Sequence, residues 1–124
     1  MHFIDIGNGK ILDFDKVQTI HKDSSSGYMR LFVQDYEHYE TVISKEEFEV
    51  VFKLCSKKIV RFKNLSDSWT DTPYYINVNK ILLVQKDSHT GVPGSNKKVT
   101  YIMMSNGMWF TMENDKYKEI VRKM

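Results

Sequence analysis

Alternating apolar and polar positions predict that the first half of the chain consists of short strands. Asn8-Gly9 stands between two such stretches, and Asn-Gly is the strongest short signal for a hairpin turn. A turn is also expected at 24–27, where Ser and Gly cluster. The expected strands cover residues 3–6, 10–14, 17–22, 28–34 and 39–43.

A helix is predicted directly after these strands. Ser44 and Glu47 have the spacing of a capping box, in which each side chain bonds the backbone amide of the other residue. One apolar stripe follows at helical spacing, formed by Phe48, Val51, Phe52 and Cys55. The helix should therefore end near Cys55 and place this cysteine in the core.

The second half shows a similar order of strands and one closing helix. Asn106-Gly107 is a second hairpin signal, and the polar segment 64–73 is typical of a linker or a long surface loop. The final helix should begin near Glu113 and end at Arg122-Lys123, with the charges that a helix dipole favours at each end. Strands are expected over 58–62, 74–85, 99–104 and 108–112.

The sequence also repeats itself internally. Residues 12–24 align with residues 76–88 at an offset of 64, with identical Lys, Lys, Asp and Ser residues. The helical stripe of the first half aligns at an offset of 69 with Tyr117, Ile120, Val121 and Met124. The change of offset indicates an insertion in the loop at 88–98, where Gly and Pro already interrupt regular structure.

These patterns predict an α+β fold with an internal duplication. Each copy would be a unit of antiparallel β-hairpins followed by one C-terminal helix, the first over residues 1–56 and the second over residues 57–124. A two-stranded unit is marginal alone. We therefore expect the two copies to be fused into one compact domain.

Composition narrows the class of protein. The 124 residues are 41% hydrophobic and 27% charged, which is sufficient for a packed core. The longest apolar run, Ile81–Val84, is far shorter than a membrane span, so no membrane partner is expected. The single cysteine favours a reducing compartment, the cytoplasm.

Charge divides the chain unequally. Residues 1–55 hold six Lys/Arg and ten Asp/Glu, a net charge of −4, whereas residues 56–124 hold twelve and six, a net charge of +6. Such a dipole can orient the molecule toward a charged partner or let copies associate head to tail. A competing interpretation is that two solvated faces simply differ in charge.

Common catalytic and metal-binding motifs are missing from the sequence. The sequence has no P-loop, no dinucleotide fingerprint and no His or Cys pair at metal-ligand spacing. Asp13 and Asp15 resemble a carboxylate pair, but Asn77 and Asn79 stand at the aligned positions, and an amide does no acid–base work. We therefore expect no enzyme activity, no catalytic residue, no metal, no cofactor and no small-molecule substrate.

Two groups of side chains are candidates for a binding surface. Aromatic residues anchor many protein interfaces, and the candidate partner-binding residues are Trp69, Tyr74, Tyr36 and Tyr39. Cross-strand pairing within the sheet is the competing explanation for most of the aromatics. Basic residues suit phosphates or an acidic protein surface, and the candidates are Lys97, Lys98, Arg61, Lys63 and Arg30.

Part of the sequence resembles a known family. The expected order of strand, turn, strand and helix, followed by Tyr75–Ile81, Asn106-Gly107 and a closing helix at Tyr117–Ile120, is similar to LytTR-type β-rich DNA-binding domains. The resemblance implies that loops enter the DNA major groove, among them the segment 24–30. Single copies also resemble the FlbD-type small flagellar-operon proteins, a likeness that implies no activity.

Two functions follow from these observations. The first is a non-enzymatic protein-interaction module that acts as a regulatory or structural subunit, with another protein or a second copy as its partner. The charge division, the aromatic residues and the acidic start of the final helix favour it. The second is a LytTR-like DNA-binding regulator that contacts phosphates through basic β-hairpin loops. Small size also suits a prokaryotic or phage-encoded protein, which in the latter case would be assembled into a phage particle.

Overall fold

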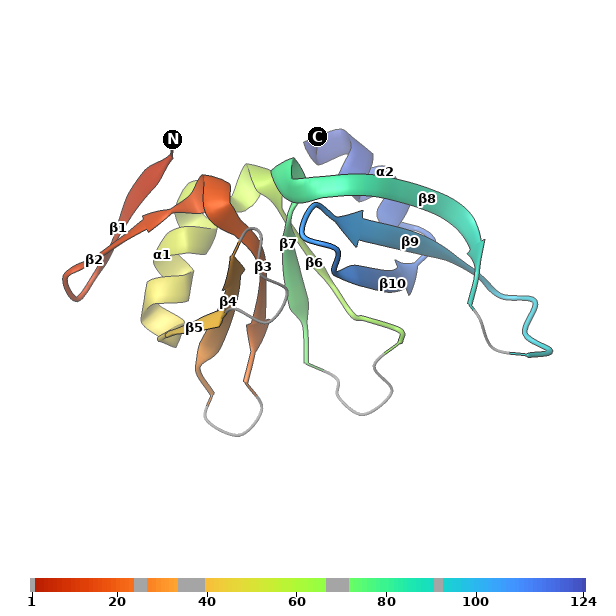
Figure 1. The fold of residues 1–124 in the computed structure, drawn as a ribbon, viewed down its shortest axis with the longest axis horizontal. Coiled ribbons are helices and arrows are strands. Elements are labelled where there is room, and N and C mark those ends of the chain that lie inside the picture. The colour runs from red at the N-terminus through yellow and green to blue at the C-terminus, as the bar shows by residue number, and fades with distance from the viewer. Residues whose placement is uncertain (1, 24–26, 34–39, 67–71, 91–92) are drawn as a thin grey trace.

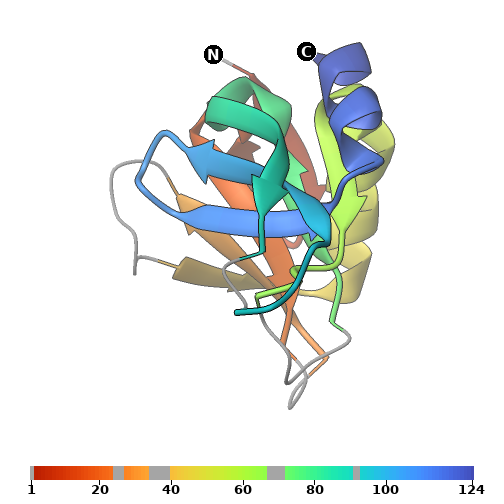
Figure 2. The ribbon, with the colours of Figure 1, turned by 90° about the vertical axis from the view of Figure 1, so that its right-hand side faces the viewer.

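The computed structural model describes residues 2–23, 27–33, 40–66, 72–90 and 93–124, and the fold is α+β. All strand pairs are antiparallel. The molecule is elongated, with an N-terminal hairpin at one end and a long hairpin at the other (Figure 1). Both helices lie on one side of the sheets (Figure 2). None of the helices in the described ranges is long and apolar enough to cross a membrane.

The first half contains a hairpin, a 3₁₀ turn, three more strands and a helix. Their bounds are β1 Phe3–Gly7, β2 Lys10–Asp13, η1 Phe14–Lys16, β3 Val17–Lys22, β4 Met29–Val33, β5 Glu40–Ile43 and α1 Lys45–Cys55.

A short 3₁₀ turn, η2 (Ser56–Lys58), leads into the second half, which contains the same kinds of element in the same order. Their bounds are β6 Ile59–Phe62, β7 Tyr74–Asn77, η3 Val78–Lys80, β8 Ile81–His89, β9 Lys98–Met104, β10 Trp109–Glu113 and α2 Lys116–Lys123. This repeated order is compatible with the predicted duplication.

Local details recur at the offset of the repeat. The Asp13 carboxylate accepts a hydrogen bond from the Asp15 amide at 3.1 Å, and the Asn77 side-chain oxygen accepts one from the Asn79 amide at 3.0 Å. Each bond caps the 3₁₀ turn that leads into the next strand. The pairing of β3 with β4 shifts between Val17 and Thr19, and that of β8 with β9 shifts between the aligned residues 81 and 83.

The two halves share one sheet. The five-stranded sheet has the order β5-β4-β3-β7-β6, so that the hairpin of the second half extends the strands of the first. The remaining strands form a two-stranded sheet, β1-β2, and a three-stranded sheet, β10-β9-β8. The chain thus joins its halves by main-chain hydrogen bonds between β3 and β7, at the centre of the molecule (Figure 1).

Each half has its own cluster of buried side chains. The first cluster extends from Ile4 to Ile59 and includes Phe14, Phe48 and Cys55. The second cluster consists of residues of the second half alone and is lined by Val60, Phe62, Ile76, Val78, Ile102, Met104, Phe110, Met112 and Ile120. Since Ile59 belongs to the first cluster, β6 serves both cores.

Several local predictions are confirmed. Ser44 Oγ accepts from the Glu47 amide, and Glu47 Oε1 accepts from the Ser44 amide, which completes the capping box of α1. The Asn8-Gly9 turn has positive φ at both residues, 57° and 76°, as a type I′ hairpin requires. Cys55 is buried on the apolar stripe of α1.

One local prediction is wrong. The expected strand 74–85 is interrupted by η3, because the Asn77 side chain caps a turn there. The connection expected at 88–98 lies between β8, which extends to His89, and β9, which begins at Lys98. The stripe of α2 is largely exposed: Ile120 is buried, whereas Val121 and Met124 face solvent. This helix packs against β6 and β8, whereas α1 packs against β1 and also contacts the Tyr75 ring of β7 through Phe48.

Candidate interaction surfaces

Tyr74 is the one predicted aromatic anchor within the described ranges; Trp69, Tyr36 and Tyr39 lie outside them. Its half-buried ring lies 5.6 Å from that of Phe62, 5.5 Å from that of Phe110 and 5.3 Å from that of His21. These rings come from both halves of the chain. Tyr74 therefore packs in an aromatic cluster where the halves meet.

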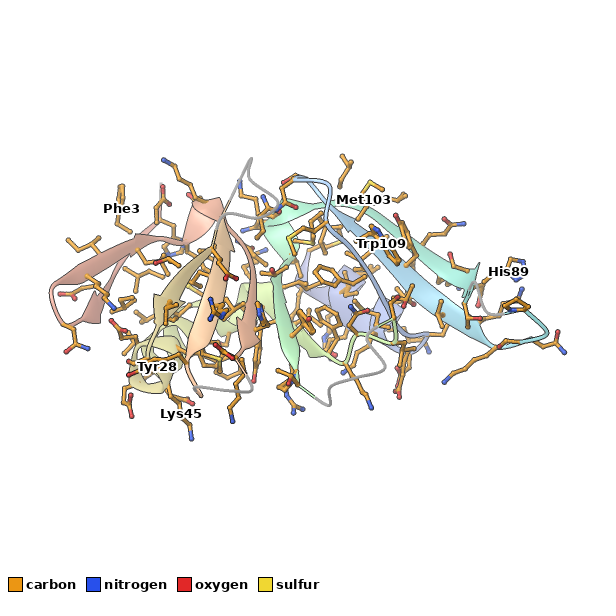
Figure 3. The ribbon with its side chains drawn as sticks, turned by 60° about the horizontal axis from the view of Figure 1, so that its bottom comes forward. Phe3, Tyr28, Lys45, His89, Met103 and Trp109 are labelled. Atoms are coloured by element: carbon orange, nitrogen blue, oxygen red, sulfur yellow. The ribbon has the colours of Figure 1, made fainter. Side chains whose placement is uncertain are left out.

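Trp109 is an exposed aromatic residue of the three-stranded sheet. It lies opposite Met103 in the pairing of β10 with β9 (Figure 3). Its ring stacks on that of Tyr101, with centroids 6.0 Å apart. The neighbouring strands thus form a cross-strand pair, the structural explanation expected for most of the aromatics.

The predicted basic residues Arg61 and Lys63 lie together in a cleft of about 250 Å³. Its other lining residues are Phe62, Pro73, Glu113 and Lys116. Three cations and one carboxylate make this cleft basic, a character that suits an anionic group. Lys116 was not a predicted site residue, because its place near β6 depends on how α2 packs.

A second basic cleft, of about 390 Å³, lies at the other end of α2. It is lined by Lys57, Lys58, Arg122, Lys123 and Met124. Lys58 Nζ donates to the Lys123 carbonyl at 3.2 Å, and Lys123 Nζ donates to the Ile59 carbonyl at 2.6 Å, so that η2 is tied to the helix end. Four basic residues are brought together from two segments far apart in the sequence.

Arg30 has a different environment. Its guanidinium donates to Asp23 at 2.8 Å and to Glu40 at 2.6 Å. The hydrogen bond with Asp23 is the main reason why the pKa of Arg30 is raised. Two carboxylates thus hold this cation within the first half.

Lys97 and Lys98 are exposed at the tip between β8 and β9. This tip forms one end of the molecule, whereas β4, which carries Arg30, lies in the other half (Figure 1). The five predicted basic residues therefore occupy three separate places. The structure brings Arg61 and Lys63 together, and Lys97 and Lys98 together, but does not unite all five into one surface.

Six described strands lie at sheet edges, β1, β2, β5, β6, β8 and β10, and two of these edges expose aliphatic side chains next to each other or on the outer hairpin strand. Among the strands that the structure describes, β8 pairs with β9 alone and β2 pairs with β1 alone. Leu82 and Leu83 on β8 and Ile11 on β2 are exposed. An open edge presents unpaired amides and carbonyls to which another strand can bind. Sequence reasoning missed both edges, because pairing between strands is not encoded in one strand alone.

The structure gives the one cysteine a structural role. Burial raises the pKa of the Cys55 thiol to about 11, and the nearby Asp15 carboxylate adds to this effect. The thiol is therefore protonated at neutral pH and is a poor nucleophile. Within the described ranges, no group of three His, Cys, Asp or Glu residues is placed to hold a metal ion.

Comparison with family models, with curated proteins and with solved structures finds no match to this chain. The resemblance to LytTR-type and FlbD-type proteins therefore stays a prediction.

Proposed function

We propose that this protein is a non-enzymatic protein-interaction module, a regulatory or structural subunit that binds its partner by strand addition at an open sheet edge. The observation that carries the proposal is the edge of β8, where Leu82 and Leu83 are exposed on a strand that pairs, among the described strands, with β9 alone. Natural proteins usually protect such edges with charges, proline or a covering segment. The part of this edge at Ile81–Val84 carries neither a charge nor a proline, which favours a binding function.

Register shifts limit the regular part of the β8 edge at both ends. Asp87 has a φ of 58°, and the pairing of β8 with β9 shifts between Gln85 and Ser88 and again between Ile81 and Leu83. A bulge of this kind bends a strand and ends regular pairing. The regularly paired part is thus Leu83–Gln85, the same length as the pairing of β3 with β7 at residues 19–21.

A capture experiment tests this proposal. The wild-type protein, the double variant Leu82→Asp with Leu83→Asp, and the control Leu54→Asp would each be used as bait in extracts of the native host. Leu54 is exposed on α1, away from β8, so its substitution adds a charge without touching the edge. A partner retained by the wild type and the control but lost by the β8 variant supports strand addition. Partners held equally by all three proteins would contradict it.

The proposed compartment is the cytoplasm, or a phage particle for a phage-encoded protein. The single buried cysteine supports a reducing compartment, since it forms no internal disulfide.

A second candidate function is DNA binding, and the two basic clefts favour it. They lie along β6 and α2 and contribute Arg61, Lys63 and Lys116 at one end and Arg122 and Lys123 at the other. Phosphate contacts from such residues make affinity fall steeply with salt. This surface differs from the β-hairpin loops that the LytTR resemblance implies.

Binding to mixed-sequence duplex DNA at about 50 and 200 mM salt tests this alternative. The double variants Arg61→Glu with Lys63→Glu and Lys97→Glu with Lys98→Glu would be compared with the wild type. Salt-dependent binding that the first pair abolishes supports the clefts, and loss with the second pair supports the hairpin tip. Absence of binding at the lower salt concentration would eliminate DNA as the partner.

A further inference from the structure

We propose that copies of this protein associate head to tail, the β2 edge of one copy adding to the β8 edge of the next in the register by which β7 adds to β3 within the chain. The inference rests on the proposed strand addition and names its partner, a second copy. The internal junction between the halves serves as the template.

The template is a short antiparallel pairing. Across it Thr19 lies opposite Ile76, Ile20 opposite Tyr75 and His21 opposite Tyr74. Thr19, Ile20 and Ile76 are buried. The junction thus joins a hairpin to the first strand of a three-stranded meander and excludes water from the contact.

Both strands of this junction have an equivalent elsewhere in the chain: β8 corresponds to β3, and β2 corresponds to β7. At the offset of 64, residues 19, 20 and 21 of β3 correspond to Leu83, Val84 and Gln85 of β8. Residues 74, 75 and 76 of β7 correspond to 10, 11 and 12 of β2. The hairpins also match, because Phe3 lies opposite Asp13 as Ile59 lies opposite Asn77. In the proposed contact Leu83 faces Leu12 of the next copy, and Val84 faces its Ile11.

Apolar side chains are exposed on both surfaces of the proposed contact, the β1-β2 hairpin and the β8 edge with α2. Phe3 is 60% exposed, Ile11 71%, Leu82 68%, Leu83 46% and Met124 59%. Four of their counterparts in the internal junction, Ile59, Gln18, Thr19 and Cys55, are each at most 4% exposed, and the fifth, Tyr75, is half-buried. The same structural positions are therefore buried where the junction is made and exposed where it is not.

The helices extend the correspondence. The Tyr75 ring lies 4.7 Å from Phe48 and 6.2 Å from Phe52 of α1. The counterparts on α2 are Tyr117 and Val121, and Val121 is exposed. Ile11 of the next copy would cover them, as Tyr75 covers α1. This contact would cover the exposed part of the α2 stripe.

Charge favours the same orientation. The β2 end belongs to the half with net charge −4, and the β8 end belongs to the half with net charge +6. Opposite charges accelerate association and select head-to-tail over head-to-head contact. Phe3 lies toward one end of the long axis and His89 toward the other (Figure 3), so the two surfaces of one copy do not compete.

One position differs between the junctions. Asn77 donates to the carbonyls of Phe14 and Val17 at 3.1 and 3.0 Å across the internal junction. Its counterpart, Asp13, has no amide donor, and its carboxylate would face two carbonyl oxygens of the next copy. The contact between copies is therefore weaker than the internal one, and the association is reversible and concentration-dependent.

The assembly has heterologous contacts. The strands of β8–β10 cross the direction of β3–β7 in Figure 1, so each step from one half to the next includes a rotation. A repeated heterologous step closes into a ring or continues as a helical filament.

Complementation between two blocked variants tests the proposal. Ile11→Asp blocks the β2 surface, and Leu82→Asp with Leu83→Asp blocks the β8 surface; all three positions are exposed, so the fold of one chain is retained. Mass would be measured by light scattering and sedimentation over a concentration series. Wild-type mass should rise with concentration, and each variant alone should be monomeric. An equimolar mixture should form a dimer and no larger species, because only one intact pair of surfaces remains.

A gain-of-function variant sharpens the test. Asp13→Asn restores the amide of the internal junction and should tighten association about tenfold. Leu54→Asp, on the outer face of α1, should leave the mass of the wild type unchanged. The proposal is overturned if the wild type and the Asp13→Asn variant, measured separately, both stay monomeric at millimolar concentration. It is overturned as well if the blocked variants associate like the wild type. It is also overturned if the mixture fails to dimerise.

Failure of self-association and failure of the proposed function can be distinguished. A monomeric wild type that still captures a β8-dependent partner from extracts would refute self-association and leave strand addition in place. Self-association that is insensitive to the β8 variant, with capture that is equally insensitive, would refute both.

Discussion

The two halves of the chain have the same order of elements but different burial. The meander β3–β5 receives the hairpin β6-β7, and α1 beside it buries Phe48, Val51 and Cys55. The meander β8–β10 receives no described strand, and Ile120 is the buried residue of α2. Each core is built mainly from its own half, and the following hairpin adds Ile59 and Tyr75 to the first core. The difference between the halves thus lies at the few positions that this hairpin covers in the first half.

Substitution by alanine should give the largest difference in unfolding free energy between equivalent positions at Ile76 and Leu12. Ile76→Ala should lower the free energy of unfolding by about 2–5 kcal/mol, because a fully buried side chain at the internal junction is lost. Leu12→Ala should cost about 1 kcal/mol, since Leu12 is only partly buried. Urea denaturation at low protein concentration measures both. Equal costs would contradict the comparison.

The next largest difference in unfolding free energy is expected when Asn77 and Asp13 are each exchanged for the residue found at the other position. Asn77→Asp removes a donor to two buried carbonyls and should cost about 2–3 kcal/mol. Asp13→Asn should change the stability of the single chain by less than about 0.5 kcal/mol, because the Asn oxygen can cap the 3₁₀ turn as Asn77 does. Thermal and urea unfolding of the two variants check this. A large cost for Asp13→Asn would show that the two caps are not equivalent.

The helix N-termini provide a smaller, pH-dependent difference. The hydrogen bond from the Ser44 amide is the main reason why the pKa of Glu47 is lowered, and Lys10 adds to it. A carboxyl whose pKa is lowered on folding stabilises the fold above its unfolded pKa, and this stability is lost as pH falls through the folded value. Glu47→Gln should therefore cost about 1 kcal/mol at pH 7 and nothing at the acid end.

The control for Glu47 is Asp115, where α2 begins without a side-chain cap. Asp115→Asn should change the free energy of unfolding at pH 7 by less than about 0.5 kcal/mol, because no capping hydrogen bond is lost. Unfolding of the Glu47→Gln variant and the wild type is followed from pH 7 down to about 2. A Glu47→Gln profile parallel to that of the wild type would contradict the role assigned to this carboxylate.

The smallest change in stability is expected at Met124, the exposed counterpart of Cys55. Met124→Ser should alter the free energy of unfolding by less than about 0.5 kcal/mol, whereas Cys55→Ser should cost at least about 1 kcal/mol. In the native wild type, the protonated and buried Cys55 should react with thiol reagents only after the chain opens. Rapid labelling of native protein would show that α1 does not bury this residue.

Local sequence signals predicted most elements of the fold. The capping box at Ser44 and Glu47 and the Asn8-Gly9 turn depend on neighbouring residues only, and both are present. The stripe of α1 was predicted for the same reason. Apolar spacing could not distinguish it from the stripe of α2, because burial of either stripe depends on which hairpin packs against it.

The candidate surfaces were harder to predict from the sequence. Arg61 and Lys63 are close in sequence and share a cleft, but Lys116 and the cluster of Lys57, Lys58, Arg122 and Lys123 join them only through the packing of α2 on β6. Arg30 was predicted from its charge alone, without the two carboxylates that surround it. The open edges of β2 and β8 depend on sheet order, which no local pattern specifies.

The sheet shared between the halves has a consequence for synthesis on the ribosome. Residues of α1 and β1–β5 emerge first, but the core they form includes Ile59, and β3 pairs with β7. The N-terminal half therefore cannot complete its sheet until residue 77 has left the exit tunnel. Until then the nascent chain exposes the edge of β3, and at this stage a chaperone or another strand has access to it.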